Sequence, residues 1–175
     1  MFSYVFILYH YNSNTIHADQ IPSRNRLQLL HTYTNVINIL ENHSLKPCLQ
    51  RLDNECSTSL KEFMTSESIN LQLTLKGLHC RNLVECAIKT YKNHFIAKIC
   101  STHTDFPPNL WDKPVPQSVL IINLLRPACL NRNISAHAYL HVAFAYNQTH
   151  IVPSDIKIID HVRPEERGSC PSPCY

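Results

Sequence analysis

The period of the hydrophobic pattern changes repeatedly along this chain, and no other feature restricts its fold as strongly. From residue 69 to residue 75, apolar side chains alternate with polar ones, which is the period of a half-buried strand. From residue 82 to about residue 100, apolar side chains recur at the spacing of a helix with one buried face. Such a succession of strands and helices predicts an α/β domain. The predicted buried stripe of the long helix consists of Val84, Ile88, Tyr91, Phe95 and Ile99.

The same patterns outline the remaining elements. They predict a hairpin from residues 2–9 and 15–21, a turn at Pro22 and Ser23 that can cap a helix, and that helix from 27 to about 42. A short extended stretch ends at Asp53, and a short helix follows around 60–64. Residues 117–125 predict a buried helix, 136–146 fit a helix or a strand, and 155–162 predict a late strand. We expect residues 1–126 to form the core and residues 127–175 a partly irregular extension.

Size and composition fit one globular domain. The chain has 175 residues, of which 44% are hydrophobic and 17% are charged, so it can bury a core and does not resemble a disordered chain. A net charge of +3 is mild, so nucleic-acid binding has to be argued from local patches. No apolar run approaches the ~20 residues of a membrane span, so we expect no membrane partner.

Eight cysteines permit a disulfide or a zinc interpretation. None of them forms the C-x2-C pair that is typical of structural zinc sites. The opening segment contains an apolar run but lacks the basic start and the small-residue cleavage site of a signal peptide. We therefore expect an intracellular protein, nuclear or cytoplasmic and not secreted, with reduced thiols. The alternative is a secreted, disulfide-stabilised interaction protein, and a free-thiol count separates the two.

Two carboxylates suggest a site for phosphoryl transfer. Asp53 ends a predicted strand, and Glu85 lies in the first turn of the long predicted helix. Carboxylates that meet across a sheet and a helix can share divalent metal ions, and Mg²⁺ prefers such oxygen ligands. The spacing also fits a simpler interpretation, in which Asp53 and Asn54 form a turn while Asn82 and Glu85 cap the helix.

Four ordered segments resemble the integrase catalytic core of copia-type retrotransposon polyproteins. That resemblance spans about residues 4–169 and implies a ribonuclease-H-like α/β fold, with a mixed sheet flanked by helices. In this family three carboxylates bind two divalent metal ions, Mg²⁺ or Mn²⁺, for 3′-end processing and strand transfer. Asp53 matches the second carboxylate and Glu85 the third. The implied partner is DNA, as retroelement ends and target DNA, and a homo-oligomer is compatible with the family. The segments are LQRLDNECSTSLKEFM, HCRNLVECAIKTYKNHF, NLWDKPVPQSVLIINLLRP and RPEERGS.

The first carboxylate of the family pattern has no match in this sequence. In the family it stands on a strand at the centre of the sheet, before the hairpin, and only residues 1–3 precede Tyr4 here. We therefore expect a core that is truncated at its N-terminus and lacks the first, central strand. We also expect a retroelement-derived fragment that is catalytically inactive. The sequence leaves open whether any enzyme activity remains.

A basic segment around the long helix suggests contact with nucleic acid. Glu85, Lys89 and Lys92 fall on one face of that helix, away from the apolar stripe. In the resembled family this helix faces the DNA backbone. The alternatives are a solvated surface with one Glu-Lys pair, or a non-catalytic DNA-binding module that uses helix 81–98. The expected nucleic-acid-binding residues are Lys76, Arg81, Asn82, Lys89 and Lys92.

The eleven histidines could also suggest metal or acid-base chemistry. His79 is the most interesting by sequence because it lies close to Glu85. Scattered surface or half-buried histidines are the more common case. The sequence alone therefore assigns no histidine to a site.

Overall fold

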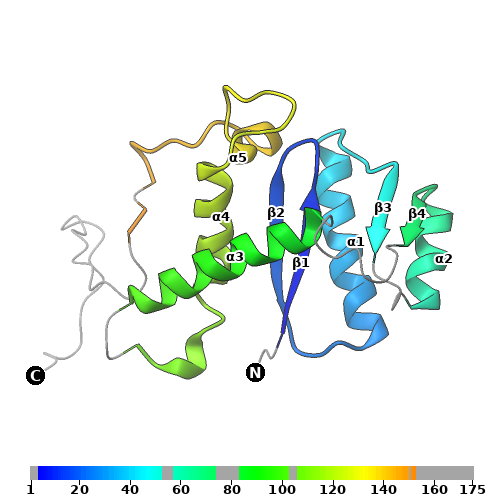
Figure 1. Ribbon diagram of the computed structural model, residues 1–175, viewed down its shortest axis with the longest axis horizontal. Helices are drawn as coiled ribbons and strands as arrows, with labels where there is room; N and C mark the ends of the chain where they lie inside the picture. The colour runs from blue at the N-terminus through cyan, green and yellow to red at the C-terminus, as the bar shows by residue number, and fades with distance from the viewer. Residues whose placement is uncertain (1–3, 53–56, 74–82, 103–105, 150, 153–175) are drawn as a thin grey trace, which may run out of the picture.

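The computed structural model describes residues 4–52, 57–73, 83–102, 106–149 and 151–152. Strands and helices succeed one another along the chain, as the changing hydrophobic period predicts (Figure 1). The described elements are β1 (Tyr4–His10), β2 (Thr15–Ile21), α1 (Arg26–Asn42), β3 (Leu49–Leu52), α2 (Thr58–Ser66), β4 (Asn70–Leu73), α3 (Leu83–Cys100), the 3-10 turn η2 (Pro108–Leu110), α4 (Val115–Leu125) and α5 (Ala136–Leu140).

The predicted hairpin is confirmed. β1 and β2 pair antiparallel, from Tyr4 opposite Ile21 to His10 opposite Thr15. Asn14 has a φ of 58° in the turn between them. Asparagine tolerates this left-handed conformation better than most residues, which explains how the hairpin turns without glycine.

A second pair of strands is parallel. β3 and β4 pair from Leu49 opposite Asn70 to Leu52 opposite Leu73, and α2 forms the crossover that a parallel pair requires. Within the described residues, the strands form two separate two-stranded sheets, β1-β2 and β3-β4. One antiparallel pair and one parallel pair, together with the helices, give the mixed α/β class that the sequence predicts.

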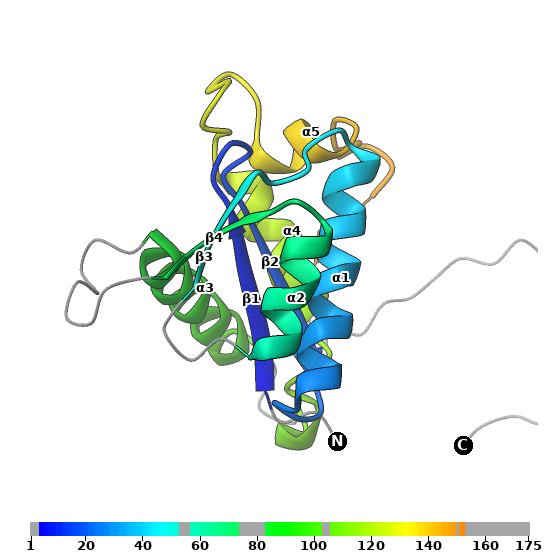
Figure 2. The ribbon, with the colours of Figure 1, turned by 90° about the vertical axis from the view of Figure 1, so that its right-hand side faces the viewer.

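Helices cover both faces of the hairpin (Figure 2). On one face, Leu8 packs with the buried side of α1 and with Met64 of α2. On the other face, Ile16 and Ala18 pack with α3 and α4. Since successive strand side chains point to opposite faces, both faces of this apolar hairpin are buried in a three-layer arrangement.

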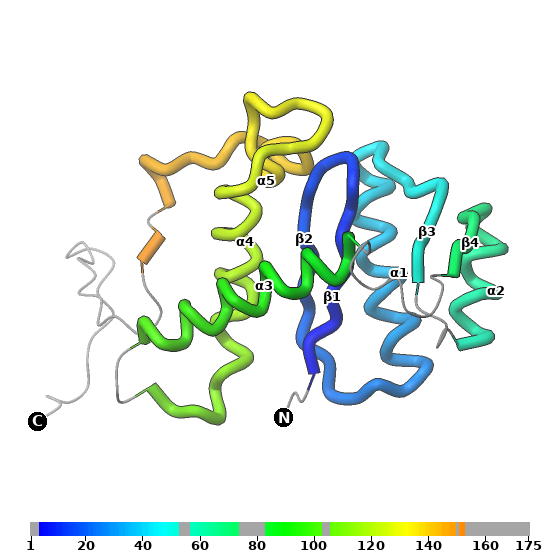
Figure 3. The backbone as a smooth tube through the Cα atoms, viewed as in Figure 1, coloured from blue at the N-terminus to red at the C-terminus, as the bar shows by residue number. Residues whose placement is uncertain are grey.

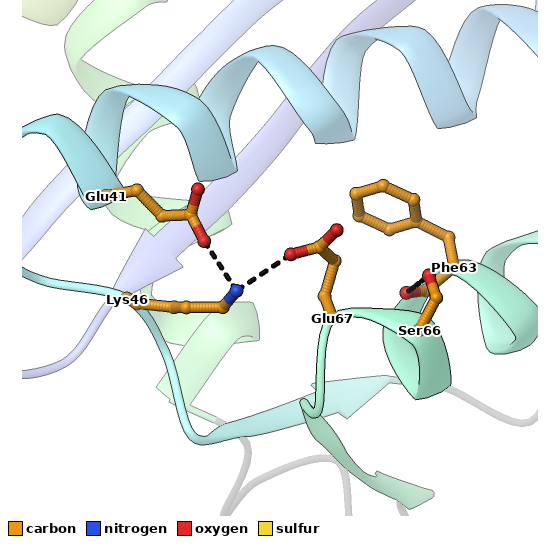
Figure 4. Close-up of polar contacts among 5 residues, drawn as sticks. All are labelled: Glu41, Lys46, Phe63, Ser66 and Glu67. Atoms are coloured by element: carbon orange, nitrogen blue, oxygen red, sulfur yellow. Dashed lines mark hydrogen bonds and ion pairs between the residues drawn. The ribbon is translucent and has the colours of Figure 1, made fainter.

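An ion-pair bridge ties the end of α1 to the end of α2 (Figure 4). The Lys46 ammonium lies 2.6 Å from a Glu41 carboxylate oxygen and 2.7 Å from a Glu67 carboxylate oxygen. Hydrogen bonds to Glu41 and Glu67 raise the pKa of Lys46. The bridge is exposed to solvent, so packing of Tyr33 edge-on against Phe63, 5.9 Å between ring centroids, contributes more to holding the two helices together.

A buried asparagine fixes α4 against the outer edge of the hairpin. The Asn123 side chain accepts a hydrogen bond from the Ile16 amide at 2.9 Å and donates one to the Ile16 carbonyl at 2.8 Å. These two bonds satisfy the backbone amide and carbonyl of Ile16 on the outer edge of β2. Within the described residues, no other strand pairs with that edge. Arg126 at the end of α4 also donates hydrogen bonds to the Asn14 carbonyl and side chain.

The structure resolves one of the remaining sequence predictions, corrects another and leaves two untested. The 136–146 region, which fits helix or strand by sequence, contains the short helix α5. The cap of α1 is Asn25, whose side chain accepts from the Gln28 amide at 2.8 Å, and not the Pro22–Ser23 turn. The late strand at 155–162 lies outside the described residues. The domain boundary at residue 126 stays a prediction.

Two further observations concern the chain's environment. Among the described residues, no helix is both long and apolar enough to cross a membrane. The described cysteines Cys48, Cys86, Cys100 and Cys129 are free thiols at the surface.

Candidate metal and nucleic-acid interface

The start of α3 lies beside the C-terminal ends of β3 and β4 (Figures 1 and 2). Of the predicted site residues, the structure describes Glu85, Lys89 and Lys92, all of them on α3. Asp53 directly follows the last residue of β3 but lies outside the described residues. Three other predicted residues also lie outside the described part of the chain: Lys76, Arg81 and Asn82.

Glu85 occupies the first turn of α3 and is half-buried. A carboxylate in the first turn interacts favourably with the positive end of the helix dipole. Its oxygens are also suitable ligands for Mg²⁺ or Mn²⁺. Within the described residues, no three His, Cys, Asp or Glu side chains are grouped closely enough to hold a metal ion. The described part of the chain thus supplies one carboxylate that fits the predicted metal site.

α3 runs across the hairpin (Figure 3). Apolar side chains on the inner face of the helix hold it there. Ala87 and Tyr91 are buried against Ile16 and Ala18 of β2. Burial, with a smaller contribution from the Asp19 carboxylate, raises the pKa of Tyr91 to about 12. Tyr91 therefore stays neutral at physiological pH and serves packing.

This inner face differs by one position from the predicted stripe. Ile88 was expected to be buried, but its exposed fraction is 40%, and Ala87 takes its place against the hairpin. The small side chain of Ala87 allows the helix to approach the sheet closely. The rest of the inner face follows the prediction at Tyr91 and Phe95.

The outer face of α3 is a mixed basic and apolar surface. Lys89 and Lys92 are exposed, and so are Ile88 and Ile96. Ile88, Lys92 and Ile96 are spaced by four residues and therefore lie along one side of the helix. Exposed ammonium groups can contact phosphates, and neighbouring apolar side chains can contact sugars or bases. We call the four residues Ile88, Lys89, Lys92 and Ile96 the outer face of α3.

One basic residue of helix 81–98 does not belong to this surface. Lys98 is buried, and its ammonium donates a 2.5 Å hydrogen bond to the Gln117 side-chain oxygen on α4. Burial lowers the pKa of Lys98. Lys98 therefore joins α3 to α4 and does not add to the exposed basic surface of helix 81–98. Sequence reasoning missed this role because Gln117 lies 19 positions away in the sequence.

Comparisons with solved structures identify the architecture. The catalytic core domain of human T-cell leukaemia virus type 2 integrase, solved in complex with magnesium, matches with a TM-score of 0.56 and 16% identity, over 78% of this chain and 92% of that one.

The fold is that of an integrase catalytic core.

Other solved structures agree with this assignment of a ribonuclease-H-like fold. The bovine immunodeficiency virus integrase core matches with a TM-score of 0.52 and 13% identity, over 76% of this chain and 82% of that one. A chain of the simian T-cell lymphotropic virus intasome in complex with PP2A regulatory subunit B56 gamma matches with a TM-score of 0.57 and 14% identity, over 90% of this chain and 54% of that one. No protein-family model and no curated protein sequence matches the chain.

Proposed function

We propose that this chain is an integrase-like core of copia-type retroelement origin that binds DNA through the outer face of α3. The observation that carries the proposal is the position of Lys89 and Lys92, exposed on a helix that packs across an integrase-like hairpin. Glu85, at the start of the same helix, is the described carboxylate that matches the family pattern. The copia-type assignment rests on the four sequence segments.

Asp53 and Glu85 would hold Mg²⁺ or Mn²⁺ in this proposal. When bound, such ions stabilise the attacking and leaving oxygens of a phosphoryl transfer. Asp53 follows β3 in the sequence, and Glu85 lies in the first turn of α3. The residues that match the family pattern supply two of its three carboxylates. We therefore propose that these 175 residues bind the ions weakly and do not join DNA by themselves.

DNA binding by Lys89 and Lys92 is testable by fluorescence anisotropy on a labelled duplex over a range of salt concentrations. Each phosphate contact contributes about 0.9 to the slope of log affinity against log salt, so K89A/K92A should reduce that slope by about 2. The control K113A/R132A removes the same charge from exposed residues outside α3. Equal losses in both double variants, or no loss in either, would contradict the proposed surface.

A second candidate is a DNA-binding module without a metal site. The observation in its favour is that Lys89 and Lys92 are exposed beside Ile88 and Ile96, a surface that can contact nucleic acid without a metal ion. DNA affinity that is insensitive to Mn²⁺ and unchanged in both Asp53→Asn and Glu85→Gln would favour this candidate. A loss in either variant, seen only with Mn²⁺ present, would favour the integrase-like site.

Assembly and location are also part of the proposal. The solved relatives include a trimeric form and an intasome. We propose that this chain can form a homo-oligomer and that it acts inside the cell, in the nucleus or the cytoplasm. A count of eight free thiols on denaturation would rule out a disulfide-stabilised secreted protein.

A further inference from the structure

A buried lysine lies in the last turn of α3 without an anionic partner among the described residues. The exposed fraction of Lys98 is 8%, and within the described part of the chain its ammonium forms no ion pair. Burial lowers the pKa of Lys98, whereas a neighbouring carboxylate would raise it. Buried charges in proteins are normally paired. The Lys98 ammonium is therefore suited to bind an anion that the described residues do not supply.

Gln117 of α4 holds this ammonium in place. Its side-chain oxygen accepts a hydrogen bond from Lys98 at 2.5 Å, and its side-chain nitrogen donates one to the Val152 carbonyl at 2.5 Å. An ammonium group has three N–H donors, and Gln117 accepts from one of them. Lys98 is thus fixed against α4 while it keeps donors for a ligand.

The side chain of Lys98 lines a pocket of about 370 Å³, where α3 and α4 meet residues 151–152. His94 lines the same pocket, one helical turn before Lys98. Its Nε2 atom is buried and has no hydrogen-bond partner, while the ring forms a hydrogen bond to the backbone of Ser118. When both ring nitrogens are protonated, Nε2 is a donor. The pocket therefore brings together two nitrogen groups that can bind one anion.

The other walls of the pocket favour a ligand with an apolar body. They include Ala97, Ile121, Ile151 and Val152. Pockets of about 300–1,000 Å³ with apolar walls and a few polar groups are typical of small-molecule sites. A phosphate monoester carries a charge of about −1.5 to −2, more than one ammonium neutralises, whereas a carboxylate carries a single charge. The pocket thus fits a carboxylate better than a phosphate.

We propose that this pocket binds a small organic monocarboxylate. The carboxylate lies on Lys98 and His94, and the apolar body of the ligand packs against Ile121 and Ile151. The site is separate from the outer face of α3 and requires neither DNA nor a metal ion. A bound molecule would connect the end of α3 to α4.

The test is a ¹H–¹⁵N NMR titration of the full chain with benzoate, with benzamide as a neutral molecule of similar shape. We expect saturable shifts of the amide signals around Lys98 and Ile121 with benzoate and not with benzamide. Lys98→Met keeps the length of the side chain and removes its charge, so it should weaken benzoate binding about tenfold or more. The matched control is Lys113→Met, at an exposed lysine that does not line the pocket, and it should leave the affinity unchanged.

A second variant keeps the test decisive if Lys98→Met disturbs the fold. Ala97 is exposed and lines the pocket, so Ala97→Leu fills part of the space from the helix surface and should also weaken benzoate binding. The NMR spectrum of each variant checks its fold.

Four results would overturn the proposal. They are the absence of saturable shifts with benzoate, equal binding of benzoate and benzamide, binding of inorganic phosphate without binding of benzoate, and a benzoate affinity that neither Lys98→Met nor Ala97→Leu changes. None of these results bears on DNA binding by Lys89 and Lys92, so the two proposals fail separately.

Discussion

At the scale of single residues, the hydrogen bonds of Asn123 show how much of the architecture depends on one polar side chain. Its amide pairs with both backbone groups of Ile16, at 2.9 and 2.8 Å. Asn123 and Ile16 are both buried. A buried amide in this position performs the role of a neighbouring strand.

Asn123→Leu should therefore destabilise the fold strongly. The change leaves the Ile16 amide and carbonyl without partners, and each buried unsatisfied group costs about 1–3 kcal/mol, so we expect a loss of about 2–6 kcal/mol in the free energy of unfolding. Urea denaturation measures it, with Asn38→Leu on the exposed side of α1 as the control. Equal midpoints for wild type and Asn123→Leu would refute this role.

The lowered pKa of His17 predicts how the stability of the protein depends on pH. Burial, with smaller contributions from His10 and His141, lowers its pKa to about 4. The ordinary value is about 6.5, so between pH 6.5 and 4 the unfolded chain binds a proton that the folded chain does not. Stability should therefore fall as the pH falls, by about 3 kcal/mol at pH 4 from this residue alone.

Urea denaturation at about pH 7.5 and about pH 4.5 checks this prediction in wild type and His17→Gln. The variant cannot gain the proton, so its stability should change less between the two pH values. The remaining histidines contribute to both proteins and cancel in the comparison. An identical pH dependence in the two proteins would show that His17 is not protected from protonation.

At the scale of elements, local pattern predicts much of the fold. The hairpin, α1, α2 and α3 all follow from hydrophobic period, because each element buries one face against a neighbour. The ends of the helices are less predictable from the sequence. Asn25 caps α1 where Pro22 and Ser23 were expected, since a cap depends on the geometry of the entering chain.

The surroundings of individual side chains are harder to predict, because they depend on residues that are far away in the sequence. Periodicity alone cannot decide between Ile88 and Ala87 on the inner face of α3, since adjacent positions differ by only 100° around a helix. In the sequence Lys98 belongs to a basic segment, but in the structure its ammonium donates a hydrogen bond to Gln117 of α4. His43 and His141 meet only when α1 and α5 are both in place.

At the scale of the whole molecule, the proposed function requires that separate elements act together. The structure places α3 across the hairpin and near the ends of β3 and β4. Within the described residues, β1-β2 and β3-β4 remain separate sheets. Glu85, in the first turn of α3, is the described carboxylate on which the proposed chemistry depends.

The most direct test of the integrase-like site is a titration with Mn²⁺ followed by ¹H–¹⁵N NMR, since a bound paramagnetic ion broadens nearby amide signals. We expect signals around Glu85 and Asp53 to broaden first, and both Glu85→Gln and Asp53→Asn to suppress this effect. His43→Gln should leave it unchanged. Broadening that spreads evenly over the surface, or that persists in both carboxylate variants, would contradict a metal site at Asp53 and Glu85.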